Sequence, residues 1–308
     1  MTMTTVLITG GTGMIGSALT KALTEKAYKV IILTRKAKPS TGIVSYKEWD
    51  VAKGVIDRDS IAEADYIIHL AGANVADGRW TEKRKKEIVD SRVKSGELLV
   101  RSLKETPNKV KAVISASAIG WYGPDPQVPN PTPFVETDRM DDSFLGATSK
   151  LWEASIQPVL EFDKRLVIFR IGIVLSNEGG AYAEFKKPLN FSAATILGNG
   201  KQVVSWIHID DLVRLFIAAI KNEKLTGIYN AVAPNPVTNK ELIVEISKQR
   251  HKLYIPLHVP TFALKIALGE MSVEVLKSAT VSSKKLEGTG FQFLYPTITD
   301  AVKNLSAS

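Results

Sequence analysis

Short apolar runs alternate along the chain with longer amphipathic stretches, and this alternation predicts the fold. The runs have the length of buried strands, and the gaps between them are long enough for helices. Strands that alternate with helices predict an α/β fold with a doubly wound parallel sheet and helices on both faces. Right-handed crossovers place the carboxyl ends of such strands at one edge of the sheet, where a ligand is expected. The runs are Val6–Thr9, Lys29–Leu33, Val44–Trp49, Tyr66–Leu70, Val110–Ser115 and Leu166–Ile171.

The first run leads directly into three glycines spaced three residues apart, at the start of an apolar-periodic helix. Gly10 permits a sharp turn, Gly13 lets the backbone approach a phosphate, and Gly16 lets the helix pack closely on the strand. A pyrophosphate is well placed at such a helix N-terminus. We therefore expect a dinucleotide site of the Rossmann type, although an ordinary glycine turn would show the same triplet. The expected cofactor contacts in this loop are Gly10, Thr12, Gly13, Met14, Ile15 and Gly16.

The end of the second run indicates which dinucleotide is bound. A carboxylate at this place bonds the ribose 2′-hydroxyl of NAD, whereas an arginine suits the 2′-phosphate of NADP. The chain has Thr34, Arg35 and Lys36 here and no carboxylate, so NADP(H) is the expected cofactor. The plainer alternative is that Arg35 is a solvated charge at a strand end. Asp50, which follows the third run, is the expected partner of the adenine amino group.

The alternation becomes irregular beyond about Ile173, which suggests a division into two lobes. Residues 1–174 are expected to form the NADP-binding Rossmann domain, to which residues 206–231 return. Residues 175–205 and 232–308 are expected to form a smaller, mostly helical C-terminal substrate lobe.

Two local signals refine this division. Gly123–Asp142 contains five prolines, so it cannot form a regular helix or a central strand, and we expect a long loop over the crevice. In the second lobe, Thr238-Asn239-Lys240-Glu241 is a capping box that predicts the start of a helix.

Composition excludes several other classes of protein. A hydrophobic content of 44% with 23% charged residues is that of a globular protein, and no apolar run approaches the roughly 20 residues that span a bilayer. The first strand begins soon after Met1, so no leader is expected and the cytoplasm is the expected location. The chain has no cysteine and no histidine spacing typical of metal ligands, so no metal site is expected. The net charge of +8 includes the run Lys83–Lys86, but its acidic neighbours favour a solvated helix face over nucleic-acid binding.

Further motifs, in order along the chain, carry a resemblance to a known family. They are the glycine loop, His69-Leu70-Ala71-Gly72-Ala73, Ser115-Ala116-Ser117 leading to Tyr122-Gly123, and Trp206-Ile207-His208-Ile209-Asp210-Asp211. With these the chain resembles the extended short-chain dehydrogenase/reductase superfamily. More narrowly, it is similar to the epimerase-family branch, named for nucleoside-diphosphate-sugar epimerases, which carries a small C-terminal domain of unknown function. The motifs shared with that branch are Gly78-Arg79-Trp80-Thr81, Ser91-Arg92-Val93, Gly198-x-Gly200-x-Gln202, Tyr229-Asn230-Ala231-Val232-Ala233-Pro234 and Gly288-x-Gly290-Phe291-x-Phe293.

The resemblance implies where the cofactor lies. Leu70, Ala71 and Gly72 would pass beneath the adenosine and pyrophosphate, Ser117 would face the nicotinamide, and Ile173 would lie near the same ring. The substrate would be a small molecule, for which a sugar nucleotide is one candidate. Candidate wall residues of the substrate site, of which the tryptophans are equally consistent with core packing, are Arg79, Trp80, Asn199, Gln202 and Trp206.

The chain departs from the superfamily at the catalytic helix. The superfamily uses Tyr-x-x-x-Lys, in which the tyrosine transfers the proton and the lysine lowers the tyrosine pKa and holds the ribose. Lys150 matches the lysine, but Gly146 stands four residues earlier. A literal Tyr182-x-x-x-Lys186 lies in the substrate lobe, on the wrong connection, and is interpreted as coincidence.

Other residues could replace the missing tyrosine. Tyr122 leaves the same strand edge five residues after Ser117, although aromatic packing beside Trp121 is an equal alternative. Glu136 and Asp138 in the long loop are candidate acids.

Two functions remain open at this point. The first is an NADP(H)-dependent oxidoreductase or sugar-nucleotide epimerase-like enzyme that transfers hydride to or from a carbonyl or alcohol carbon, with Ser117 positioning the reacting oxygen. The second is a non-catalytic NADP(H)-binding regulatory or redox-sensing protein that lost the tyrosine. A homodimer is compatible with both, and neither nucleic acid nor a membrane is an expected partner.

Overall fold

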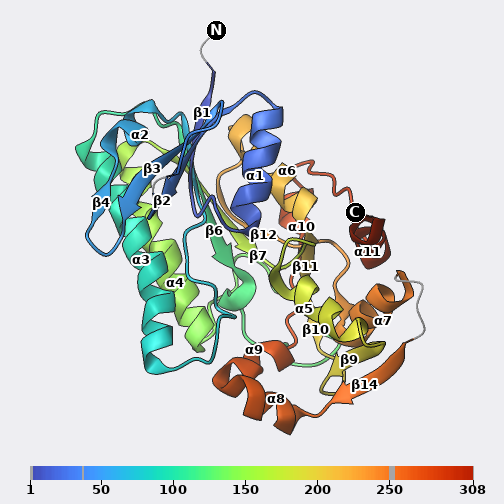
Figure 1. The fold of residues 1–308 in the computed structure, drawn as a ribbon. Helices are drawn as coiled ribbons and strands as arrows, with labels where there is room; N and C mark the ends of the chain where they lie inside the picture. Colours follow the sequence, from blue (N-terminus) through green and yellow to red (C-terminus); the bar gives the residue numbers. More distant parts are fainter. Residues whose placement is uncertain (1–2, 37, 250–253, 308) are drawn as a thin grey trace.

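An eight-stranded sheet in the order β12-β7-β6-β5-β1-β2-β3-β4 forms the centre of the molecule (Figure 1). The computed structural model describes residues 3–36, 38–249 and 254–307. Neighbouring strands of this sheet run parallel, apart from the antiparallel pair of β3 and β4. The doubly wound parallel sheet predicted from the sequence is therefore confirmed. Its strands are β1 (Thr5–Thr9), β2 (Lys29–Thr34), β3 (Val44–Asp50), β4 (Val55–Ile56), β5 (Tyr66–His69), β6 (Ala112–Ala118), β7 (Arg165–Ile171) and β12 (Gly227–Ala231).

All six predicted runs form strands of this sheet, although β6 ends three residues later than expected. The chain order reverses at β1, where Thr9 lies between Leu33 of β2 and His69 of β5. In open α/β sheets the ligand crevice lies outside the carboxyl ends of the strands at such a reversal. The glycine loop, which follows Thr9, is located at this point.

Helices cover both faces of the sheet (Figure 1). Alternate residues of a strand point to opposite faces, so Ile8 joins one core and Leu7 joins the other. The first core is closed by α1 (Met14–Glu25) and α6 (Ile209–Lys221), and the second by α3 (Glu82–Glu105) and α4 (Phe144–Ile156). The shorter α2 (Arg58–Glu63) and the 3-10 turns η1 (Ile119–Trp121) and η2 (Gln157–Phe162) complete this part of the chain.

A third core of buried side chains, including Tyr182, Trp206 and Leu242, lies in the C-terminal lobe. The predicted capping box forms, because the Thr238 amide donates to the Glu241 carboxylate and the Glu241 amide to the Thr238 hydroxyl. The lobe also has three strand pairs that the sequence did not reveal: β8 with β11, β9 with β14 and β10 with β13. Its elements are β8 (Ile173–Leu175), α5 (Gly180–Leu189), β9 (Ala193–Leu197), β10 (Val203–Val204), β11 (Trp206–His208), β13 (Val237–Thr238), α7 (Asn239–Gln249), β14 (Ile255–Val259), α8 (Thr261–Leu268), η3 (Gly269–Met271), α9 (Ser272–Leu276), α10 (Lys284–Glu287) and α11 (Ile298–Ala307).

The proline-rich stretch Gly123–Asp142 is a long loop, as predicted, and it is fastened to the C-terminal segment. The buried carboxylate of Asp125 accepts hydrogen bonds from the Ser278 hydroxyl at 2.8 Å and from the Thr280 amide at 2.9 Å. The Phe134 amide donates to the Thr280 carbonyl at 2.8 Å. These bonds hold the loop in one conformation. No helix within the described ranges is both long and apolar enough to cross a membrane.

Candidate functional site

The three glycines of the first loop differ in what surrounds them. Gly10 has a φ of +68°, and a Cβ there would lie 2.9 Å from the Leu70 carbonyl. A Cβ on Gly16 would lie 2.5 Å from the backbone oxygen of Gly10, so helix α1 packs too closely on the loop for any side chain. Gly13 has an ordinary extended backbone, with φ −82° and ψ 174°, and a Cβ there would meet only the Gly10 oxygen, at 3.4 Å. The fold itself therefore does not require glycine at position 13, and the space beside it is available to a ligand.

The N-terminus of α1 also fits an anion. The first N–H groups of a helix lack partners within the helix, and at this helix no side chain caps them and no acidic residue lies in the first turn. The glycine loop therefore presents free amides and the positive end of a helix dipole to the crevice. Gly10, Gly13 and the first turn at Met14 form a cradle that fits a pyrophosphate.

At the end of β2, Arg35 and Lys36 are exposed, and neither forms an ion pair with any residue that the structure describes. Thr34 is half-buried and its hydroxyl accepts from the Lys36 amide at 3.4 Å. Asp50 stabilises the turn after β3, where its Oδ1 accepts from the Ala52 amide at 3.0 Å. Its predicted contact with adenine therefore stays a prediction, as do the contacts of the two cations.

The loop after β5 is held against the glycine loop by Thr9. The Thr9 hydroxyl accepts from the Leu70 and Ala71 amides at 3.1 and 3.2 Å, and it bonds His69 Nδ1 at 2.8 Å. Complete burial lowers the pKa of His69 to about 3, so this imidazole is neutral at physiological pH. His69 therefore orients the loop that begins at Leu70, and only its place in the His-Leu-Ala-Gly motif could have signalled this role.

The end of β6 enters a buried network of charged groups. Ser117 Oγ donates to Glu153 Oε1 of α4 at 2.7 Å. Arg170 of β7 donates two hydrogen bonds to the same carboxylate, from Nε at 2.8 Å and from Nη2 at 3.0 Å. The three side chains are only 1 to 3% exposed. Because the Ser117 proton is donated inward, its oxygen has only lone pairs left for a ligand. Glu153 and Arg170 were not among the predicted site residues, although Glu153 lies three residues after Lys150 and Arg170 lies within a predicted strand.

Tyr122 belongs to the same buried network. It was expected to lie beside the substrate instead. It is fully buried, its hydroxyl donates to Asn230 Oδ1 at 2.7 Å, and Arg170 Nη1 donates to that hydroxyl at 3.1 Å. The ring stacks on Phe134. Burial raises the pKa of Tyr122 to about 12. Its environment is thus that of a packed aromatic residue, which was the alternative interpretation.

Lys150 of helix α4 is an exposed residue, whereas Ser149 and Glu153 are each 3% exposed. Lys150 lies four residues after Gly146 and three before Glu153, so it stands on the same side of the helix as both. Its predicted role at the ribose stays a prediction. At Gly146 no side chain fits, because a Cβ would collide with the backbone oxygen of Asp141.

The two loop carboxylates have different surroundings. Glu136 Oε1 accepts from the Asn230 amide at 2.8 Å, which ties the loop to β12. Asp138 accepts from the Val135 amide through Oδ2 and lines a cavity, while its Oδ1 makes no hydrogen bond with the described residues.

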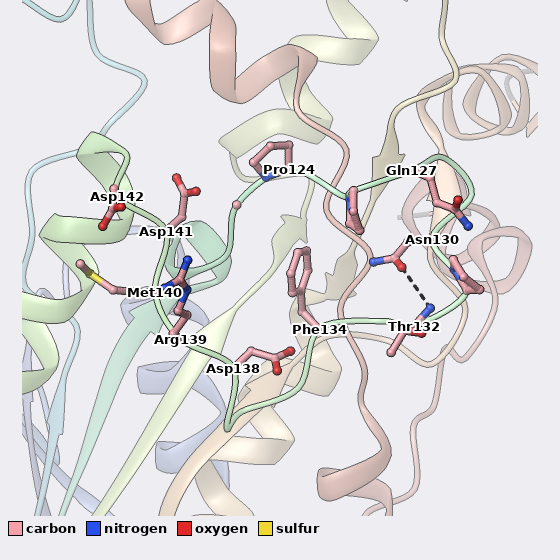
Figure 2. Close-up of a pocket in the computed structure, with 13 residues that line it drawn as sticks. Pro124, Gln127, Asn130, Thr132, Phe134, Asp138, Arg139, Met140, Asp141 and Asp142 are labelled. Carbon is pink, nitrogen blue, oxygen red and sulfur yellow. Dashed lines mark hydrogen bonds between the residues drawn. The ribbon is translucent and has the colours of Figure 1, made fainter.

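That cavity has a volume of about 800 Å³, is open to solvent and is lined by residues of the long loop itself (Figure 2). Figure 2 shows Phe134 pointing into it, with Asp141 and Asp142 to one side and Gln127 opposite. Asp138, Asp141 and Asp142 contribute three carboxylates to the lining, against the single guanidinium of Arg139.

Three of the expected wall residues of the substrate site are core residues instead. Trp80, Gln202 and Trp206 are 8, 6 and 0% exposed, and each donates its side-chain N–H to a nearby backbone carbonyl. Their aromatic and amide groups are therefore not available to a substrate. Arg79 and Asn199 are exposed, as is Ile173 at the start of β8, and their assignments stay predictions.

Both the order of the strands and the glycine cradle define a nucleotide-binding α/β protein of the extended short-chain dehydrogenase/reductase type. Residues 6–231 match the model of the NAD dependent epimerase/dehydratase family, and residues 259–305 match a domain of unknown function, DUF1731. The chain belongs to this epimerase/dehydratase family.

Named relatives support the assignment over the whole chain. The protein is 36% identical to Epimerase family protein SSP1921 of Staphylococcus saprophyticus, over 97% of this chain and 98% of the relative. It is 34% identical to Epimerase family protein YfhF of Bacillus subtilis, over 98% of each. The resemblance read from the sequence motifs is confirmed.

Solved structures show the same fold. Human epimerase family protein SDR39U1, solved with NADPH, superposes with a TM-score of 0.86 at 27% identity and covers 99% of both chains. UDP-glucuronic acid 4-epimerase from Bacillus cereus, solved with UDP-glucuronic acid and NAD, superposes with a TM-score of 0.80 at 19% identity over 98% of both chains, and it shares the fold.

Proposed function

We propose that this protein is an NADP(H)-dependent oxidoreductase or epimerase that acts on a small carbonyl or alcohol substrate. The observation that carries the proposal is Gly13, a glycine that neither the backbone conformation nor the packing of the chain requires. A space kept open beside the free amides of α1 fits a dinucleotide pyrophosphate. Residues 1–174 and 206–231 would bind this cofactor, and residues 175–205 and 232–308 would bind the substrate.

The preference for NADP(H) over NAD(H) is proposed from Arg35 and Lys36. Both cations are exposed at the end of β2 without an anionic partner in the described chain, and a 2′-phosphate would provide one. The similar human protein solved with NADPH supports this choice.

When bound, the nicotinamide would supply the hydride acceptor or donor. In this chain Ser117 holds its proton on Glu153, so its oxygen would accept a hydrogen bond from a substrate hydroxyl or from the carboxamide. Asp138 is the proposed proton-transferring group, since one of its carboxylate oxygens is unbonded and it lines the loop cavity.

A sugar nucleotide is the proposed class of substrate, as for the Bacillus cereus enzyme solved with UDP-glucuronic acid. The loop cavity carries three carboxylates and one guanidinium. Carboxylates accept hydrogen bonds from hydroxyl groups and repel phosphate. The sugar end of the substrate, rather than its diphosphate, therefore fits this cavity.

The proposal is tested in two stages. The first is titration of the purified protein with NADPH and NADH, followed by fluorescence, in which NADPH is expected to bind at least about tenfold more tightly. The second is a screen of sugar nucleotides, aldehydes and alcohols for turnover of NADPH or NADP⁺. Failure to bind NADPH would contradict the proposal. Binding without turnover of any compound would support a non-catalytic NADP(H)-binding protein instead.

A further inference from the structure

Helix α4 directs the buried carboxylate of Glu153 to Ser117 at the end of β6. Glu153 is already paired with Arg170, so that arginine is not free to bind an anion. A cation beside the loop that follows β5 would be well placed for a dinucleotide phosphate.

Arg92 of α3 lies in the required position. Its Nη1 donates to the Ala73 carbonyl at 3.0 Å, in the loop that follows β5. A Cβ on Gly72 would lie 3.1 Å from the guanidinium carbon. The guanidinium carbon is also 4.9 Å from the centre of the Trp152 ring on α4. Arg92 thus lies between α3, α4 and the loop that begins at Leu70.

The charge of Arg92 is not neutralised within the described part of the chain. None of the ion pairs there includes Arg92. Burial and the like charge of Arg84 lower the pKa of Arg92 to about 10, which leaves it cationic at neutral pH. Nη1 makes both of its hydrogen bonds, to Ala73 and Ile88, so Nε and Nη2 keep N–H groups for another partner. The guanidinium is half-buried and has no anionic partner, so a phosphate beside it would be favourable. The neighbouring Trp152 has a buried indole N–H that makes no hydrogen bond with the described residues.

The position of Arg92 along the crevice indicates which part of a dinucleotide it would meet. Arg35 follows β2, on one side of β1, whereas Arg92 packs on the loop after β5, on the other side. If the 2′-phosphate lies at Arg35, the pyrophosphate crosses at the glycine loop and the nicotinamide half extends towards β5 and β6.

We propose that Arg92 binds the nicotinamide-side phosphate and ribose of NADP(H). This inference rests on the proposed cofactor and assigns a new binding residue to that site. A guanidinium gives up to two parallel hydrogen bonds to a phosphate, so it is suited to hold this half of the ligand.

The test compares two ligands that differ in the nicotinamide half. NADPH carries it, and adenosine 2′,5′-bisphosphate retains only the adenosine half with its 2′-phosphate. Arg92→Met keeps the apolar stem beside Trp152 and should weaken NADPH binding at least about tenfold while leaving the affinity for the bisphosphate unchanged within about twofold. Arg92→Lys should restore part of the NADPH affinity. Arg35→Met should weaken both ligands, and Lys104→Met, the matched control at the C-terminal end of α3, where the lysine is exposed, should change neither.

The possible failures are distinguishable by calorimetry with the same proteins. Wild-type affinity for NADPH in Arg92→Met would overturn the assignment of Arg92 and leave the proposed cofactor intact. An equal loss of both ligands in Arg92→Met would show general damage to the crevice and would also overturn it. If the wild-type protein binds neither ligand, the proposed function itself is wrong.

Discussion

The Gly13→Val variant tests whether this glycine is required by the fold or by a bound ligand. At φ −82° and ψ 174° a valine adopts an allowed extended conformation, and its Cβ meets only the Gly10 oxygen, at 3.4 Å. Replacing a glycine at a compatible site stabilises a protein by about 0.4–1 kcal/mol, because the unfolded chain loses freedom. Gly13 is also the N-cap of α1, where valine is less favourable than glycine. Because the two effects oppose each other, the free energy of unfolding of Gly13→Val should stay within about 1 kcal/mol of the wild type.

The same substitution should strongly weaken the binding of NADPH. The valine methyl groups would occupy the space through which a pyrophosphate reaches the amides of α1. A hydrogen bond to a charged group contributes about 1.5–3 kcal/mol, so the loss of even one weakens NADPH binding by about ten- to hundredfold.

Gly16→Ala is the matched control in the same loop. Its methyl group would lie 2.5 Å from the Gly10 oxygen and from Gly11 Cα, both backbone atoms that cannot move aside cheaply. Overpacking of this kind costs about 1–3 kcal/mol. Thermal unfolding and NADPH fluorescence titration of both variants measure the contrast. The reasoning is refuted if Gly13→Val binds NADPH as tightly as the wild type, or if it loses stability as Gly16→Ala does.

Further predictions concern the two ends of the crevice and the buried groups. Arg35→Asp should erase or reverse the preference for NADPH, and fluorescence titration with NADPH and NADH measures it; an unchanged preference would contradict the role of Arg35. Tyr122→Phe removes one hydrogen bond of Arg170 Nη1 and leaves the buried Asn230 side-chain oxygen without its donor, so it should lower the free energy of unfolding by about 1–3 kcal/mol, seen in urea denaturation, with little change in turnover; a kcat loss of about 10² would instead make it the catalytic tyrosine. Asp138→Asn should lower kcat by about 10² with unchanged NADPH affinity, and equal kcat would remove it from the mechanism. Because the pKa of His69 is about 3 when folded and about 6.5 when unfolded, the unfolded state binds more protons below pH 6.5. The stabilisation is complete above that pH and is lost towards pH 3, by at most about 1.4 kcal/mol per pH unit. Urea denaturation at several pH values should show a shallower loss in His69→Gln, and equal slopes would contradict the assignment.

The parts of the fold predicted from the sequence are those in which local signals agree with the tertiary structure. The run Val6–Thr9 is apolar because both faces of a central parallel strand are buried, and the glycines after it are required by contacts within the same loop. The strand pair β9 and β14 was missed for the opposite reason. Its two strands lie far apart along the chain, and β14 is short, largely exposed and contains Pro256, a residue that argues against a strand in a sequence.

The candidate catalytic residues were harder to predict because their roles depend on the direction in which a side chain points. Tyr122 follows Ser117 by five residues, yet its side chain is fully buried and bonded to Asn230 and Arg170, which spacing along the chain could not reveal. Trp80 and Trp206 resemble binding residues by type, yet their indole N–H groups satisfy carbonyls of the core. Glu153 was invisible as a site residue, since only the tertiary structure brings it to Ser117 and Arg170.

The attachment of the proline-rich loop at Asp125 bears on how the chain divides into separable parts. The four donors of the Asp125 carboxylate include Ser278 and Thr280, which belong to the segment matched by the domain of unknown function. A fragment that ends at residue 231 would retain the loop but lose these donors. The Asp125 carboxylate would then be exposed to water, or the loop would misfold. The C-terminal domain is thus not a removable module. It holds in place the loop that lines the cavity, which is encoded more than a hundred positions earlier, so insertions or fusions are better tolerated at the chain ends than at the boundary between the two family segments.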